Sequence, residues 1–209
     1  MKKHLSTAYL VLIFGILYIP ILTLIFFSFN SANSTAVFDG FSLRWYKELF
    51  NSPDTFTALR NTLILAISSA TIATVIGTAA AEGIYKMKSK LLKATINSVT
   101  NIPMMNPDIV TGVSMMLLFV GVGAIVGAKS TLGFWTMLIA HTTFNLPYVI
   151  LQVLPKFRQM DKNLTEAALD LGCTPMQTFF RVELPSIMPG IVSGLMMSFT
   201  LSLDDFVIS

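Results

Sequence analysis

The stretch DKNLTEAALDLGCTPMQTFFRVELPSIMPG, residues 161–190, lies between two long apolar runs and predicts a pair of short helices. Asp161 or Asn163 can cap the first helix, in which leucine and alanine recur at helical spacing. Gly172 follows this pattern just beyond the expected helix end, where a left-handed backbone conformation is common. We therefore expect the first helix to end in a glycine turn.

The second half of this stretch predicts another helix. Thr174 can cap it, and Pro175 then falls in the first turn, where a missing N–H does no harm. Pro185 is expected to limit the extension of this helix at its other end. The residues alone leave two interpretations open: an amphipathic pair lying on a bilayer surface, or a docking surface for a partner protein.

The apolar sequence on both sides of this segment indicates a polytopic membrane protein. Of the 209 residues, 54% are hydrophobic and 12% are charged, whereas an ordinary soluble domain has roughly 25% charged residues. A helix of about 20 apolar residues crosses the hydrocarbon core and satisfies its own backbone groups. The fold class is therefore all-α, a single transmembrane domain over residues 1–209. Five spans are predicted: Ala8–Phe29, Leu59–Ala81, Ile96–Val122, Leu132–Leu154 and Ile187–Ile208.

The basic residues predict the orientation of these spans. Ten lysines and arginines fall on one side, of which two are at the N-terminus, four in residues 82–95 and four in residues 155–186. The other side has four. Because basic residues concentrate in cytoplasmic loops, the N-terminus and the 161–185 loop are predicted to be cytoplasmic.

The 161–185 loop resembles the signature loop of the permease subunits of ABC importers. It fits the spacing E-A-A-x3-G-x9-[IV]-x-L-P and lies between the fourth and fifth spans, as in that family. The resemblance implies a bacterial cytoplasmic (inner) membrane protein of the type I ABC importer permease fold, whose loop inserts into an ATPase subunit. It also implies that the family's sixth helix is missing after Ser209. The residues implied in coupling are Glu166, Ala167, Ala168, Gly172, Leu184 and Pro185.

Three further stretches resemble one branch of these permeases, the spermidine/putrescine (polyamine) type. They are YIPILTLIFFSFN at residues 18–30, GFSLRWYKELF at 40–50 and SFTLSLDDFVIS at 198–209. The resemblance implies the second permease subunit of a pair, with two cytoplasmic ATP-binding subunits, a homologous permease and an extracytoplasmic polyamine-binding protein as partners. This chain would bind no cofactor, because the partner ATPase uses ATP and Mg. Permeases for iron, thiamine, phosphonate or sulfate share the loop and stay as alternatives.

A polyamine is a methylene chain with several ammonium groups, so its path should offer carboxylates and aromatic faces. Two adjacent carboxylates near the end of the fifth span are costly, at about 2.5 kcal/mol or more for a charge in the bilayer. Each candidate also has a structural interpretation: a helix cap at Asp108, an interface anchor at Trp45, and an external membrane boundary at the acidic pair. The predicted substrate-binding residues are Asp108, Trp45, Ser202, Asp204 and Asp205.

Other classes of function fit the sequence less well. The chain contains no Walker A sequence, so ATP hydrolysis is assigned to a partner. A single cysteine and two distant histidines argue against a metal or redox enzyme. An intramembrane enzyme with an aspartate dyad is disfavoured, because neighbouring helical residues diverge by about 100°. An autonomous channel would leave the docking loop unexplained, and no nucleic-acid partner is expected.

Overall fold

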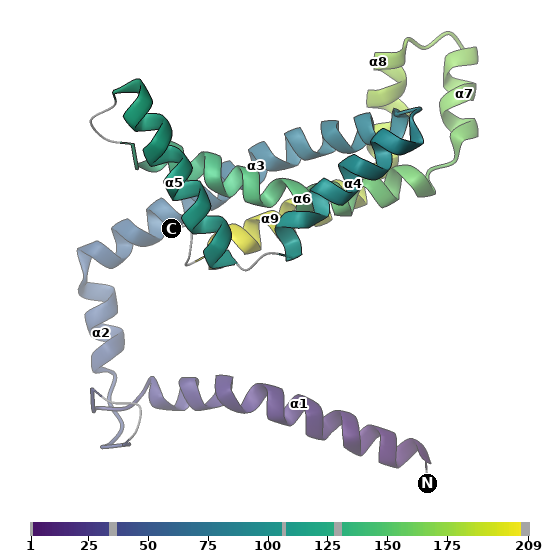
Figure 1. The fold of residues 1–209 in the computed structure, drawn as a ribbon. Coiled ribbons are helices and arrows are strands. Elements are labelled where there is room, and N and C mark those ends of the chain that lie inside the picture. Colours follow the sequence, from purple (N-terminus) through teal and green to yellow (C-terminus); the bar gives the residue numbers. More distant parts are fainter. Residues whose placement is uncertain (1, 34–36, 106–107, 128–130, 206–209) are drawn as a thin grey trace. The chain divides into compact units, whose positions relative to one another are not determined.

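The computed structural model describes residues 2–33, 37–105, 108–127 and 131–205. Within these ranges the regular elements are helices, with one isolated bridge between Asn30 and Phe41 (Figure 1). The chain divides into two units, Met1–Arg60 and Asn61–Ser209. The elements are α1 (Lys2–Phe27), α2 (Arg44–Asn51), α3 (Pro53–Lys86), α4 (Lys90–Met105), α5 (Asp108–Val126), α6 (Phe134–Gln159), α7 (Lys162–Asp170), α8 (Pro175–Thr178), the π-helix η1 (Phe179–Glu183) and α9 (Leu184–Asp204).

The first unit contains α1, a loop and α2. The apolar residues of α1 lie around the whole helix and are exposed, which is the pattern of a helix that faces lipid. The loop folds around the buried Asn30, whose Nδ2 donates to the Val37 carbonyl at 2.6 Å. Its Oδ1 accepts from the Asp39 N–H at 2.9 Å. The Asn30 side chain thus adds to the backbone bonds around the bridge, where the Ser31 N–H donates to the Gly40 carbonyl at 3.0 Å and the Ser42 N–H to the Phe29 carbonyl at 2.7 Å.

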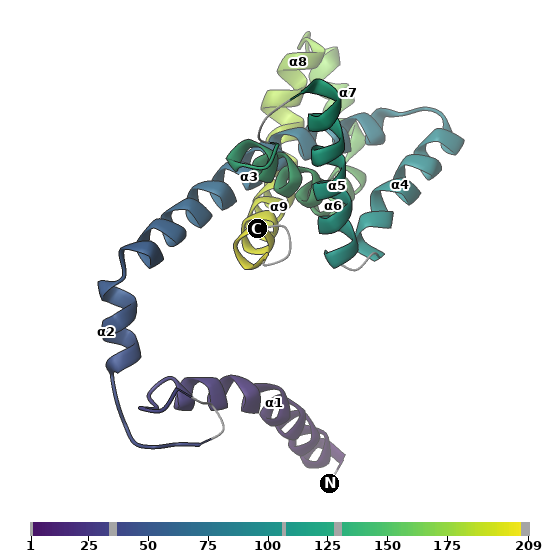
Figure 2. The ribbon, with the colours of Figure 1, turned by 60° about the vertical axis from the view of Figure 1, so that its left-hand side comes forward.

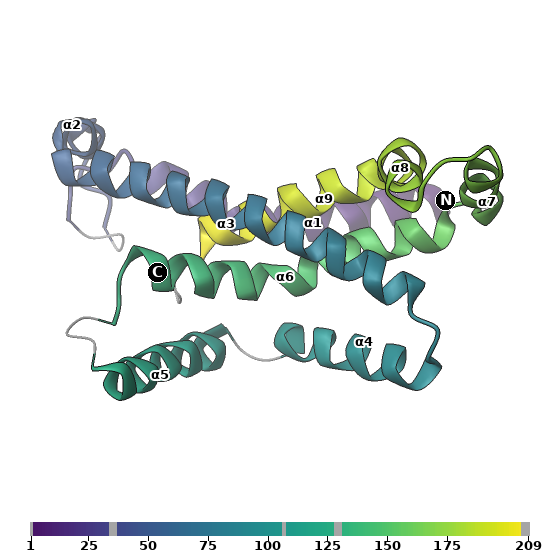
Figure 3. The ribbon, with the colours of Figure 1, turned by 90° about the horizontal axis from the view of Figure 1, so that it is seen from above.

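The second unit is built around α3, α6 and α9, which run side by side (Figures 1 and 3). Small residues line the contacts, as in many membrane helix pairs. A Cβ at Gly190 would lie 2.9 Å from the Gln152 carbonyl, and one at Gly194 would lie 3.3 Å from Val149 Cγ1. These glycines therefore let α6 and α9 pack backbone against backbone.

Among the residues that the structure describes, five helices are long and apolar enough to cross a membrane, which agrees with the predicted number. The fifth span begins earlier than the predicted Ile187, because α8, η1 and α9 follow one another without a break from Pro175. Its predicted end at Ile208 lies outside the described residues. The prediction of a single domain over residues 1–209 stays a prediction.

The third predicted span, Ile96–Val122, is two helices rather than one. α4 ends at Met105 and α5 begins at Asp108, and the two are inclined to one another (Figures 1 and 2). Pro103 lies in the last turn of α4, and proline weakens a helix by removing a backbone donor. The bounds predicted for the third span are therefore wrong: among the described residues the helix here that is long and apolar enough to cross a membrane is Ile109–Val126.

We predict that Gly77→Ala destabilises the second unit. A Cβ at this position would lie 2.7 Å from Val149 Cγ1, and overpacking of this kind costs about 1–3 kcal/mol. Val149→Ala in the same chain should restore much of the loss. The measurement is thermal stability of the purified protein in detergent. Gly83→Ala is the control, because nothing lies within 4 Å of a Cβ there. Equal stability of the two alanine variants would contradict the prediction.

Candidate functional site

The α7–α8 loop has a defined end to its first helix. Asp161 caps α7, since its Oδ1 accepts from the Asn163 N–H at 3.0 Å. Gly172 follows with φ +86°, and its N–H donates to the Leu169 carbonyl at 2.9 Å. The Cys173 N–H reaches back to the Ala168 carbonyl at 3.0 Å. These paired bonds make the glycine turn predicted from the sequence.

The second loop helix, α8, has a capping box at its N-terminus. The Gln177 N–H donates to Thr174 Oγ1 at 3.3 Å, and the Thr174 N–H donates to Gln177 Oε1 at 2.9 Å. This reciprocal pair confirms Thr174 as the cap. Figures 1 and 3 show α7 and α8 together at one end of the second unit.

The sequence predicts that Pro185 limits the extension of the second loop helix, and this prediction is wrong. It lies in the first turn of α9, directly after the π-helix η1. The Leu184 N–H donates to the Phe179 carbonyl, five residues back. This wider turn changes the backbone pairing just before the proline, so the chain stays helical through it.

The predicted coupling residues have unequal exposure. Glu166 and Ala167 of α7 are exposed, and Ala168 is buried. Leu184 is half-buried and Pro185 is exposed. Glu166 and Ala167 therefore lie on the surface of the loop, whereas Ala168 packs within the chain.

Glu183 is a buried acid that sequence reasoning missed. Only 2% of its surface is exposed, and its Oε2 lies 3.1 Å from Lys86 Nζ. Lys86 also bonds Glu82, four residues earlier on α3. The spacing of Glu82 and Lys86 was visible in the sequence, whereas their contact with Glu183 depends on tertiary packing.

Ser202, predicted as a substrate residue, belongs to a buried polar cluster between three helices. Its Oγ lies 2.7 Å from His141 Nδ1 and 2.8 Å from Ser69 Oγ. One helical turn along the same contact, Asn145 and Ser198 are also buried, and their side chains have no hydrogen-bond partner. Ser202 thus links α3, α6 and α9.

Asp204 and Asp205 do not lie in the middle of a helix. α9 ends at the exposed Asp204, and Asp205 has an extended backbone with ψ 104°. The carboxylate of Asp205 interacts electrostatically with His141. The expected 100° divergence around a continuous helix therefore does not apply to this pair.

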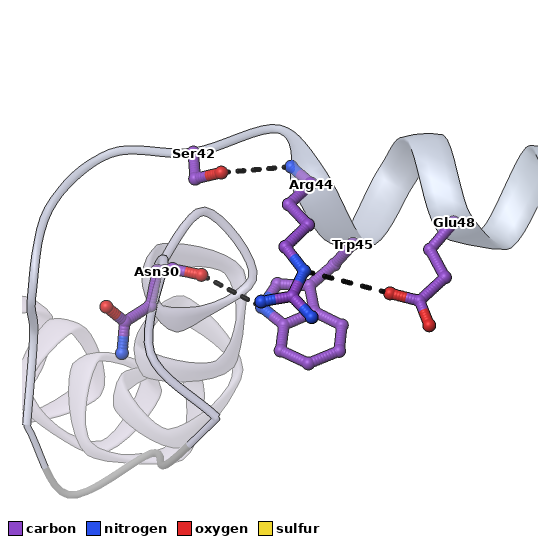
Figure 4. A network of polar contacts seen from close by, with 5 residues as sticks. All are labelled: Asn30, Ser42, Arg44, Trp45 and Glu48. Carbon is purple, nitrogen blue, oxygen red and sulfur yellow. Dashed lines mark hydrogen bonds and ion pairs between the residues drawn. The ribbon is translucent and has the colours of Figure 1, made fainter.

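Trp45 lies in the first unit, where its side chain has partners (Figure 4). The indole N–H donates to the Asn30 carbonyl at 2.9 Å, and the Arg44 guanidinium lies 5.3 Å from the ring centroid. Arg44 is also 4.0 Å from the Glu48 carboxylate. Asp108 begins α5, but its side chain lies outside the described residues. Both residues stay predictions as substrate contacts.

Comparison with known proteins identifies the family. Residues 73–209 match the model of the "Binding-protein-dependent transport system inner membrane component" family. The chain is 39% identical over 200 residues to the putrescine transport system permease protein PotI of Escherichia coli (strain K12), covering 96% of this chain and 71% of that protein. It is 38% identical over 208 residues to the spermidine/putrescine transport system permease protein PotC of Haemophilus influenzae, covering 100% and 78%. PotC of Escherichia coli (strain K12) is 37% identical over 207 residues, with 99% and 76% covered. The chain therefore belongs to the family of binding-protein-dependent transport system inner membrane components.

Proposed function

We propose that this chain is a permease subunit of an ATP-driven importer that carries spermidine or putrescine across the cytoplasmic membrane. The observation that carries the proposal is identity of 37–39% over nearly the whole chain to permeases named for these polyamines. The capped helix pair α7–α8 between α6 and α9 supports the permease part of this proposal, since the sequence of this loop resembles the docking loop of such permeases. Permeases for iron, thiamine, phosphonate or sulfate are the less favoured alternative.

In this proposal the chain supplies half of the membrane path and its partners supply the energy. Two cytoplasmic ATP-binding subunits, which use ATP and Mg, receive the α7–α8 loop. A homologous permease completes the path, and an extracytoplasmic binding protein delivers the polyamine. Of the predicted coupling residues, Glu166, Ala167, Gly172 and Pro185 are exposed and could contact an ATPase subunit directly.

The acidic end of α9 is the proposed contact for the ammonium groups. Asp204 is exposed and Asp205 is half-buried, so the pair combines access with a reduced local dielectric. A carboxylate that binds an ammonium makes a charge-assisted hydrogen bond. Asp108 and Trp45 are proposed as further stations, and Ser202 supports the wall of the path from its buried cluster.

We predict that Cys173 is reached only from the cytoplasm. It is the single cysteine of the chain and lies half-buried in the turn between α7 and α8. A membrane-impermeant thiol reagent should leave it unmodified in intact cells and modify it in inside-out vesicles. Labelling from outside intact cells would overturn the proposed orientation.

The proposed substrate is tested with the reconstituted complex of permease pair, ATPase and binding protein. Putrescine or spermidine should stimulate ATP hydrolysis and accumulate inside the vesicles. Sulfate, thiamine, phosphonate and ferric iron, added to the same complex in place of the polyamine, serve as negative controls. A complex that assembles and hydrolyses ATP but does not respond to either polyamine would contradict the proposal.

A further inference from the structure

An ion pair ties the cytoplasmic end of α3 to the base of the α7–α8 loop. Lys86 is the last residue of α3, and Glu183 is the last residue of η1, directly before α9. Lys86 Nζ and Glu183 Oε2 are 3.1 Å apart. The side chain of Lys86 is 47% exposed, whereas that of Glu183 is 2% exposed. The lysine therefore reaches from the surface to a buried acid on another element.

Two further contacts hold the lysine in this position. Glu82, one turn earlier on α3, bonds the same ammonium group. The ring of Phe179, the first residue of η1, lies 5.9 Å from Lys86 Nζ, which is within the range of a cation–π contact. Lys86 is thus held by its own helix on one side and by η1 on the other.

An open groove lies beside the contact between these elements. A groove of about 760 Å³ runs between α3 and the α8–η1–α9 segment. It is lined by Thr78 and Glu82 of α3 and by Met176 and Phe180 of α8 and η1, among others. Beside the groove, Ala81 and Ile84 of α3 share a buried core with Ile187 of α9, so the ion pair adds a polar contact to this apolar packing.

We infer that Lys86 and Glu183 are positioning residues that transmit displacement of the α8 helix to α3. This inference rests on the proposed function, in which an ATPase subunit moves the loop. α8, η1 and α9 are one continuous run, so force on α8 reaches Glu183 directly. A buried carboxylate is strongly held by a nearby opposite charge, because separating the two leaves a buried charge without compensation. The pair therefore makes α3 follow the loop.

The test measures coupling in reconstituted complexes. For each variant, uptake of putrescine and ATP hydrolysis are recorded from the same vesicles, and assembly is checked by co-purification of the ATPase. Lys86→Met and Glu183→Gln should lower uptake per ATP about tenfold, while basal hydrolysis persists. The exchange Lys86→Glu with Glu183→Lys should restore at least half of the coupling. Lys88→Met, a nearby exposed lysine, is the matched control and should behave as the wild type.

The outcomes separate this inference from the proposed function. If the wild-type complex takes up no polyamine, the proposed function fails. If the wild type transports and both single variants remain fully coupled, the inference alone fails. An exchanged pair that assembles but stays uncoupled also overturns it. If the exchanged chain does not assemble, the coupling of Lys86→Arg, which keeps the charge, is compared with that of Lys86→Met, which removes it. Equal coupling in these two variants overturns the inference.

Discussion

Replacing Gly172 with valine will lower substrate uptake at least tenfold while capture by the binding protein remains. Gly172 has φ +86°, a conformation that costs an L-residue about 1–2 kcal/mol and is worst for a β-branched side chain. Nothing lies within 4 Å of a Cβ built there, so the effect within this chain is conformational. Since 1.4 kcal/mol is tenfold in an equilibrium, we expect at least a tenfold loss of uptake.

Two further variants show whether conformation is the cause. Gly172→Asn should retain most uptake, because asparagine tolerates the left-handed region. Gly83→Val introduces the same side chain at a helical glycine with open space and should be mild. Uptake and ATPase co-purification are measured for all three. Full uptake by the valine variant would count against the loop as the coupling element.

Replacing both Asp204 and Asp205 with asparagine will lower uptake by about two orders of magnitude. The change keeps the shape of each side chain and removes its charge. A hydrogen bond to a charged group contributes about 1.5–3 kcal/mol, so the loss of two such contacts accounts for at least about 100-fold. Initial uptake rates over a range of putrescine concentrations give the measurement, and co-purification shows that assembly with the ATPase persists.

The control for this pair is Asp54→Asn, an exposed acid in the first turn of α3. It removes the same charge from a place with no proposed role, and uptake should be unchanged. The single variants Asp204→Asn and Asp205→Asn show how much of the loss of uptake comes from the exposed Asp204 and how much from the half-buried Asp205. Unimpaired uptake by the double variant would rule out the acidic pair as a substrate contact.

Local signals in the sequence predicted the loop well. Asp161, Gly172 and Thr174 act through bonds within a few residues of themselves, so their roles follow from residue type and spacing alone. The number of spans was also predictable, since hydrophobic length decides whether a helix can cross a bilayer. The caps and the number of spans can therefore be predicted without knowing which helices pack against one another.

Features that depend on tertiary packing were not predictable in the same way. Pro185 is compatible with either a helix end or a helix start. The π-helix before it places Pro185 in the first turn of α9. Glu183 is an ordinary acid in the sequence, and only the approach of α3 makes it a buried ion-pair partner. The cluster around Ser202 joins residues up to 133 positions apart, a relation that no local pattern contains.

The paired helices α6 and α9 have a consequence for biogenesis. They are consecutive spans joined by the α7–α8 segment, and they meet antiparallel through Ser202 with His141 and Gly194 with Val149. Each of these pairs of sequence positions lies at the same level of the two helices, so the hairpin has a fixed register. Neighbouring spans can associate as soon as both have entered the bilayer, and α3 is already present when they do. The order of synthesis therefore favours packing of the α6–α9 hairpin against α3, which is synthesised first. The contacts between α3 and α9, which are the most distant in sequence, then form last.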